Sequence, residues 1–203
     1  DILKGAVLSR PQLGCLGAHA APLPERPGSA PLIWAILDNL SESAMTIFQM
    51  SERIDDGPIY DFEPVSIDPE ETGGSLRTKM DAALLTVLRR CLPDILSGAN
   101  RGKSHKGERR YTRRRGPRDG EFNAVEPADD ILRKVRALST PYPGAHFFAG
   151  DGVPIIVEKA RRGDESLSYE RLSVPFGGQS GRTVLCVVAH PDDEALGLAG
   201  TLI

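Results

Sequence analysis

The sequence has few cysteines, few aromatic residues and no long apolar run, and each scarcity excludes a class of protein. Its three cysteines, Cys15, Cys91 and Cys186, are odd in number and far apart, which excludes a disulfide framework and favours a reducing cytoplasm. No stretch approaches the length of a membrane span, so we expect no membrane partner. The net charge of −3 provides no global attraction to nucleic acid.

The rest of the composition is that of an ordinary globular chain. Hydrophobic residues make up 40% and charged residues 26% of the 203 residues, which excludes wholesale disorder and allows one or two domains. The 21 glycines and 16 prolines indicate many turns. The chain opens at Asp1 without a methionine or the layout of a signal peptide, so we expect the natural start to lie upstream.

Local patterns predict alternating helices and strands. Helices are expected from Pro31 onward, over 72–98 and over 126–140, and Pro93 is expected to kink the second of them or split off its last turn. A short helix and a strand are expected before Gly17. Further strands are expected at residues 44–50, 57–67, 145–150 and 153–160, the last two paired around a Gly-Asp-Gly turn.

An ordered set of motifs occupies the first third of the chain. The stretch "GAHAAPLPERPGSAPLIWAI" is followed by "MTIFQMSERIDDGPI". The set consists of a histidine, a Leu-Pro pair, a G-x-x-P and a D-x-G, at His19, Leu23-Pro24, Gly28 to Pro31 and Asp55-Asp56-Gly57. In this order the motifs resemble those of the 10-formyltetrahydrofolate-dependent formyltransferases, which formylate methionyl-tRNA or the amino groups of nucleotide-linked sugars. The resemblance covers residues 1 to 160.

This resemblance implies a reaction and a set of residues. Formyl transfer to an amine passes through an oxyanion and releases a proton, and a histidine with a carboxylate partner can serve both needs. By resemblance, His19 is the catalytic imidazole, Asp55 its carboxylate partner and 10-formyltetrahydrofolate the co-substrate. Asp56 is the competing carboxylate, interpreted as a turn former. The residues implied in binding the cofactor are Gly17, Leu23, Pro24 and Gly57.

Two positions depart from the family pattern. The family carries an asparagine two residues before the histidine, where this chain has Gly17, and Ala21 stands at a serine position. A single oxyanion donor is worth about 10²–10³ in rate, so the loss of the amide bears on activity. One alternative is therefore a degenerate module that binds its ligand or supports a neighbouring domain. Cys15 is interpreted as a small core residue.

A basic segment follows the first motifs. Residues 101–118 contain nine Lys or Arg and one Glu. One interpretation is an electrostatic site for the phosphates of a charged tRNA or a nucleotide-sugar, which would make binding sensitive to salt. The other is a solvated linker between domains.

A second motif closes the chain. The stretch "AHPDDEALGLAGTLI" follows an apolar strand and resembles the start of the PIG-L-type N-acetylglucosaminyl deacetylases. The resemblance implies that His190 and Asp193 are ligands of Zn²⁺, and that Asp192 is the general base toward the metal-bound water. The alternative is structural, with Asp192 or Asp193 capping a helix.

Together these features predict an α/β protein. The expected architecture is the C-terminal part of a Rossmann-like formyltransferase domain, a small α+β domain, and the first strand of a second Rossmann-like domain, with parallel sheets in both Rossmann-like parts. The expected boundaries are residues 1–100, a basic linker at 101–120, the small domain at 121–162, a linker at 163–181 and a truncated deacetylase at 182–203. A deacetylase that frees an amine and a formyltransferase that formylates the same amine would act in succession in one pathway. Plain methionyl-tRNA formylation is the alternative.

Overall fold

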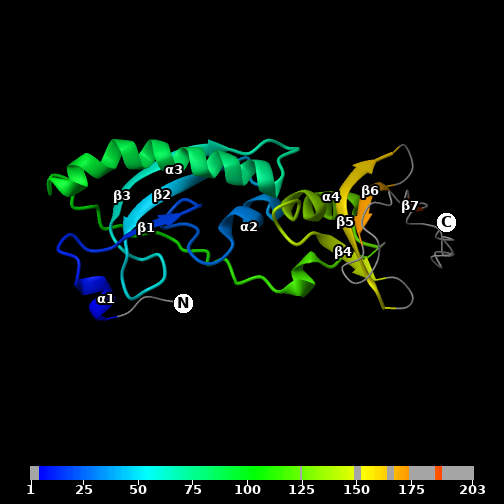
Figure 1. The fold of residues 1–203 in the computed structure, drawn as a ribbon, viewed down its shortest axis with the longest axis horizontal. Coiled ribbons are helices and arrows are strands. Elements are labelled where there is room, and N and C mark those ends of the chain that lie inside the picture. The colour runs from blue at the N-terminus through cyan, green and yellow to red at the C-terminus, as the bar shows by residue number, and fades with distance from the viewer. Residues whose placement is uncertain (1–4, 124, 149–151, 164–166, 174–185, 189–203) are drawn as a thin grey trace. The chain divides into compact units, whose positions relative to one another are not determined.

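The computed structural model describes residues 5–123, 125–148, 152–163, 167–173 and 186–188 (Figure 1). The chain divides into two compact units. The first contains residues 1–69 and 75–115, and the second contains residues 70–74 and 116–203.

The first unit is built on a three-stranded sheet with the order β1-β2-β3. Its strands are β1 (Leu16–His19), β2 (Glu42–Gln49) and β3 (Ile59–Ser66), preceded by the short helix α1 (Ala6–Ser9). Helix α2 (Pro31–Leu37) lies between β1 and β2 and starts at the proline, as predicted. Because residues 43–48 are all buried, β2 is the central strand and has both faces covered.

The pairing in this sheet differs from the predicted parallel arrangement. Both β1 with β2 and β2 with β3 pair antiparallel. Parallel pairing needs a crossover of a dozen or more residues, and only residues 50–58 connect β2 to β3. The shortness of this connection was visible in the sequence and argued against parallel pairing. The prediction followed the resemblance to a parallel fold instead.

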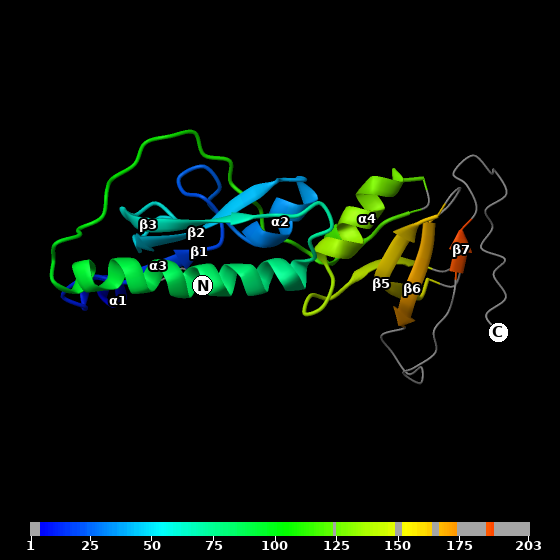
Figure 2. The ribbon, with the colours of Figure 1, turned by 90° about the horizontal axis from the view of Figure 1, so that it is seen from above.

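Helix α3 (Gly73–Leu96) covers one face of this sheet (Figure 2). Its buried residues recur at intervals of three or four, which places one apolar stripe against the strands: Leu76, Met80, Ala83, Val87, Cys91 and Ile95. Pro93 lies inside the helix, which continues past it as one element to Leu96. None of the helices in the described part of the chain combines the length and apolar character that a membrane crossing requires.

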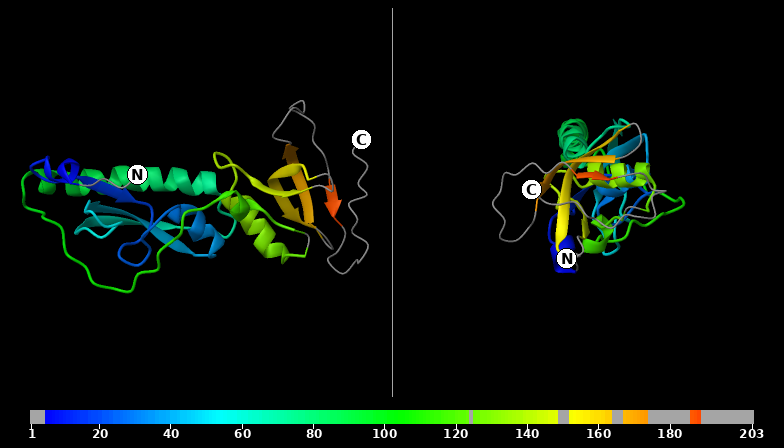
Figure 3. Two further views of the ribbon diagram at one scale, coloured as in Figure 1. Left: turned by 90° about the horizontal axis from the view of Figure 1, so that it is seen from below. Right: turned by 90° about the vertical axis from the view of Figure 1, so that its right-hand side faces the viewer.

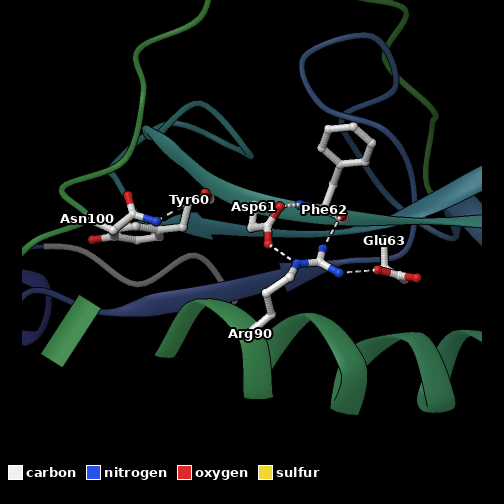
Figure 4. Close-up of polar contacts among 6 residues, drawn as sticks. All are labelled: Tyr60, Asp61, Phe62, Glu63, Arg90 and Asn100. Atoms are coloured by element: carbon white, nitrogen blue, oxygen red, sulfur yellow. Dashed lines mark hydrogen bonds and ion pairs between the residues drawn. The ribbon is translucent and has the colours of Figure 1, made fainter. Parts of the chain in front are cut away.

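One side chain ties α3 to the outer strand β3 (Figure 4). The Arg90 guanidinium donates from Nε to Asp61 Oδ2 at 2.7 Å, from Nη1 to Glu63 Oε2 at 2.6 Å, and from Nη2 to the Phe62 carbonyl at 2.8 Å. The carboxylates of Asp61 and Glu63 raise the pKa of Arg90 above its ordinary value. Asp61 also accepts the Phe62 N–H at 2.8 Å, so both backbone groups of Phe62 are occupied by side chains.

The second unit contains an antiparallel sheet with the order β4-β5-β6-β7. Its elements are the 3₁₀ turn η1 (Pro117–Gly120), α4 (Ala128–Ala137), β4 (Ala145–Phe148), β5 (Pro154–Arg162), β6 (Leu167–Ser173) and β7 (Cys186–Val188). The hairpin of β4 and β5 confirms the predicted pairing. The aromatic rings of Phe122, Phe147 and Tyr169 meet with centroids 5.6–6.1 Å apart and form part of this core.

Two strands of this sheet lie where the sequence predicted other structure. Strand β6 falls within the expected linker at 163–181, and β7 falls within the segment expected to open a second Rossmann-like domain. In the structure β7 pairs antiparallel with β6. A short apolar run such as β7 has the same composition whether it is the edge strand of one sheet or the first strand of another. Composition alone therefore did not assign β7 to the sheet of the second unit.

The stripe on α3 generates a test of the first core. Leu76 is 0% exposed and Leu85, on the same helix, is 56% exposed. We expect Leu76→Ala to lower the free energy of unfolding by about 3 kcal/mol, because it opens a cavity. The matched change Leu85→Ala is expected to cost less than about 0.5 kcal/mol. Urea denaturation measures both, and equal losses would contradict the assigned orientation of α3.

Candidate active site

His19 lies at the end of β1 and is the centre of the candidate site. It stands opposite Thr46 in the pairing of β1 with β2 and is 7% exposed. Its Nδ1 is 3.5 Å from Asp55 Oδ2, and its Nε2 is 2.8 Å from the Arg26 carbonyl oxygen. The structure therefore brings together the two residues predicted as the catalytic pair.

Asp55 is held in place by its own backbone and by a neighbouring loop. Its φ of 48° is left-handed, a conformation that Asp tolerates better than most residues. Its Oδ2 accepts the Gly28 N–H at 2.8 Å while it faces His19. Two loops, one carrying Arg26 and Gly28 and one carrying Asp55, thus enclose the imidazole.

The partners of the ring fix the role of one of its nitrogens. A carbonyl oxygen only accepts hydrogen bonds, so Nε2 donates to Arg26 in this geometry. The Asp55 carboxylate lies on the other side of the ring, 3.5 Å from Nδ1, where it can stabilise positive charge on the imidazole. Proton exchange between Nε2 and a reactant requires that the contact with Arg26 open.

The competing carboxylate, Asp56, points to other partners. It forms ion pairs with Arg53, at 3.7 Å, and with Arg109. The geometry thus agrees with the choice of Asp55 as the residue that contacts His19. Asp56 holds the loop that Asp55 occupies.

Gly17 lies directly across from Phe48 on β2. A Cβ placed on Gly17 would lie 2.6 Å from two atoms of the Phe48 ring, and Phe48 is buried. The ring therefore fills the space that a side chain at position 17 would need. Ala21 is also buried, and its carbonyl accepts the Thr46 hydroxyl at 2.8 Å.

The other residues predicted to bind the cofactor lie in different settings. Leu23 is part of the core at 8% exposure, and Pro24 follows it with intermediate exposure. Gly57 lies so close to the Gln49 carbonyl that any side chain would collide with it. Gly57 is thus required for the Asp55 loop to close against the end of β2, and the role of these residues toward a folate remains a prediction.

The predicted metal residues His190, Asp192 and Asp193 lie outside the described residues. Within the described ranges, no group of three or more His, Cys, Asp or Glu side chains is arranged to hold a metal ion.

The basic segment makes backbone contacts with the first unit, which sequence reasoning missed. We name residues 103–113 the connector. It runs past the sheet on the side away from α3 (Figures 2 and 3). Lys103 pairs with Ile59, and Thr112 pairs with Gly28, so both ends of the connector are anchored. Backbone pairing has no side-chain signature, and only the high charge of the segment was visible.

Two family models match the chain in order. The formyl transferase model matches residues 1–92, and the model of the formyl transferase C-terminal domain matches residues 116–188. The chain therefore belongs to the formyl transferase family, with an N-terminal and a C-terminal domain. The second match extends through β6 and β7.

Individual relatives agree with this assignment. A methionyl-tRNA formyltransferase of Halorhodospira halophila (strain DSM 244 / SL1) is 34% identical over 162 residues, which are 79% of this chain and 52% of that protein. The chain thus spans about half the length of this relative.

Two solved structures share the fold. A methionyl-tRNA formyltransferase from Clostridium thermocellum has a TM-score of 0.67 at 19% identity, covering 80% of this chain and 69% of that one. HypX from Aquifex aeolicus, in complex with tetrahydrofolic acid, has a TM-score of 0.64 at 19% identity, covering 76% and 29%.

The contact of Gly17 with Phe48 predicts a coupled response. We expect Gly17→Asn to destabilise the protein by about 1–3 kcal/mol, because the new side chain must displace a buried ring. Shortening that ring in the double variant Gly17→Asn/Phe48→Leu should recover part of the loss. Denaturant unfolding of both single variants and the double variant measures the coupling, and strictly additive losses would show that the two positions do not touch.

Proposed function

We propose that the protein transfers a formyl group from 10-formyltetrahydrofolate to a primary amine, with His19 and Asp55 as its catalytic pair. The observation that carries the proposal is the buried His19–Asp55 pair, 3.5 Å apart, at the motif positions that the family resemblance implies. Membership of the formyl transferase family supports the reaction, and the tetrahydrofolic acid complex of a protein with the same fold supports the co-substrate.

The residues of this chain suit the charges that develop in such a transfer. The amine nitrogen attacks the formyl carbon and gives up a proton, and the carbonyl oxygen carries negative charge in the tetrahedral intermediate. The carbonyl then re-forms as the bond to the folate nitrogen breaks, and that nitrogen takes up a proton. A protonated His19 stabilises the oxyanion, and the Asp55 carboxylate stabilises the imidazole cation. When the contact from Nε2 to the Arg26 carbonyl opens, that nitrogen is the one free to exchange a proton with the reactants.

Removal of either member of the pair tests the proposal. We expect His19→Gln and Asp55→Asn in the whole protein to lower kcat for formyl transfer by about 10²–10⁴-fold, because general acid–base catalysis is lost. Asp68→Asn is the matched control, since Asp68 is exposed and pairs with Lys79 on the surface. Formation of the N-formyl product is followed by mass spectrometry. Full activity of either site variant would exclude the assigned roles.

We propose that the acceptor carries phosphate, with methionyl-tRNA favoured over a nucleotide-linked amino-sugar. A surface hollow of about 430 Å³ is lined by Trp34, Tyr111, Asp38 and three arginines, Arg26, Arg110 and Arg113, of which Arg26 forms an ion pair with Asp38. The Arg113 guanidinium lies 5.0 Å from the centre of the Trp34 ring. Arginines beside aromatic rings suit a phosphate backbone with adjacent bases. The named activity of the 34% identical relative supports tRNA as the acceptor.

Salt dependence separates the two acceptors. A polyanionic tRNA releases counterions when it binds, so the KM for methionyl-tRNA should rise steeply with salt, by roughly tenfold or more between 50 and 200 mM. Arg113→Gln, which removes one charge from the hollow, should flatten that slope by about one unit in log KM against log salt. A nucleotide-sugar, with two phosphates, should show a far weaker dependence. Turnover of the amino-sugar alone would remove tRNA as the acceptor.

Gly17 bears on the alternative of a module that binds without catalysis. The Phe48 ring fills the space that the Cβ of a side chain at this position would need. If formyl transfer by the whole protein is absent while tetrahydrofolate still binds, as measured by calorimetry, the binding module is the better assignment.

We also propose, from the "AHPDDE" motif, a zinc-dependent deacetylase segment that begins after β7. His190 and Asp193 would hold the ion and Asp192 would act as base. These residues follow the last residue of the matched C-terminal domain, which ends at 188. The proposal depends on the motif alone. Zinc content of the whole protein, compared with His190→Ala, tests it, and an unchanged content would remove it.

A further inference from the structure

The connector pairs with the loop beside His19 as a strand would. The Arg110 N–H donates to the Glu25 carbonyl and the Thr112 N–H to the Pro27 carbonyl, both at 2.8 Å. In return, the Ser29 N–H donates to the Thr112 carbonyl at 2.9 Å. These contacts use the backbone of residues 25, 27 and 29, which are alternate positions of one loop.

The intervening residues of that loop serve the catalytic pair. The Arg26 carbonyl accepts from His19 Nε2, and the Gly28 N–H donates to Asp55. The groups that face the catalytic pair therefore alternate along the loop with those that bind the connector, so the connector fixes the direction of both sets. Gly28 has a φ of 119°, and a side chain there would collide with the Thr112 carbonyl.

The connector also holds the loop that carries Asp55. His105 Nε2–H donates to the Gly57 carbonyl at 3.0 Å. Arg109 forms an ion pair with Asp56, and both partners are largely shielded from solvent. The two residues that follow Asp55 are therefore each bound by a different side chain of the connector.

We propose that His105 and Arg109 are positioning residues of the formyl-transfer site. They hold Asp56 and Gly57, and thereby hold Asp55 against His19, while the connector backbone orients Arg26 and Gly28. This inference rests on the proposed function for its kinetic effect, and on the described contacts alone for its structural effect. It assigns to a charged segment a role in geometry, separate from any attraction it exerts on phosphate.

The kinetic test separates position from charge. We expect Arg109→Gln and His105→Ala to lower kcat by about tenfold, because sub-ångström displacement of a catalytic group is costly. His105→Gln, which keeps a donor, should recover most of the kcat that His105→Ala loses. Arg110→Gln removes an equal charge but keeps the backbone contact to Glu25, so it should change only the KM for the acceptor.

A second readout needs no activity. In the full chain, hydrogen exchange of the Gly28 amide, whose N–H is bound to Asp55, is followed by NMR. We expect Arg109→Gln and His105→Ala to accelerate this exchange by about tenfold, while Ile47 in β2 stays protected. Arg110→Gln should leave the Gly28 rate unchanged. Equal rates in all variants would overturn the inference, even if formyl transfer itself proves absent and the proposed function fails.

A double-mutant cycle completes the design. If Arg109 acts through Asp56, then Asp56→Asn should lower kcat as Arg109→Gln does, and the double variant should be no worse than either single variant. Additive losses would mean that Arg109 acts through another partner, which also overturns the inference. Loss of protection at Ile47 in any variant would identify global unfolding of that variant. In that case His105→Gln is compared with the unmodified protein in its place.

Discussion

The candidate site depends on the backbone of one short loop, residues 25–29. Its hydrogen-bonding groups are divided between two tasks, since alternate residues bind the connector and the others bind His19 and Asp55. Neither task needs a particular side chain, apart from the glycine at position 28. The precision of the catalytic pair therefore comes from peptide groups whose directions are set by the chain on their far side. Such groups lose no rotamer freedom, which makes them suitable for fixing an imidazole.

Much of the fold could be predicted because its signals are local. The apolar stripe from Leu76 to Leu92 predicted α3, and the patterns around Ile47 and Val157 predicted β2 and β5. Two predictions failed for different reasons. The antiparallel pairing of β2 with β3 was indicated by the short connection between them, but the resemblance to a parallel fold was followed instead. The addition of β7 to the sheet of β4–β6 does not follow from composition. Pro93 is a similar case: propensity predicts a kink or a break, and the helix nevertheless continues to Leu96.

The candidate site divides in the same way. His19 and Asp55 carry their chemistry in their side chains, so ordered motifs identified them and the structure brings them together. The Arg26 carbonyl, the Gly28 N–H and the contact of Phe48 with Gly17 have no signature in a single sequence. His105 and Arg109 were visible only as members of a basic segment. The composition of that segment indicated only its charge. The structure shows in addition that His105 and Arg109 contact the loop that carries Asp55.

The hydrogen bonds from Arg90 to β3 have a consequence for the association of one copy of the protein with another. An outer strand with unpaired peptide groups is a template on which another chain can add a strand. Two positions along β3 already have these groups bound, Phe62 by Asp61 and Arg90, and Ile59 by Lys103. Another strand could pair with β3 there only after it displaced the Arg90 guanidinium and the connector. At these two positions the edge of the sheet is therefore closed to the addition of a strand.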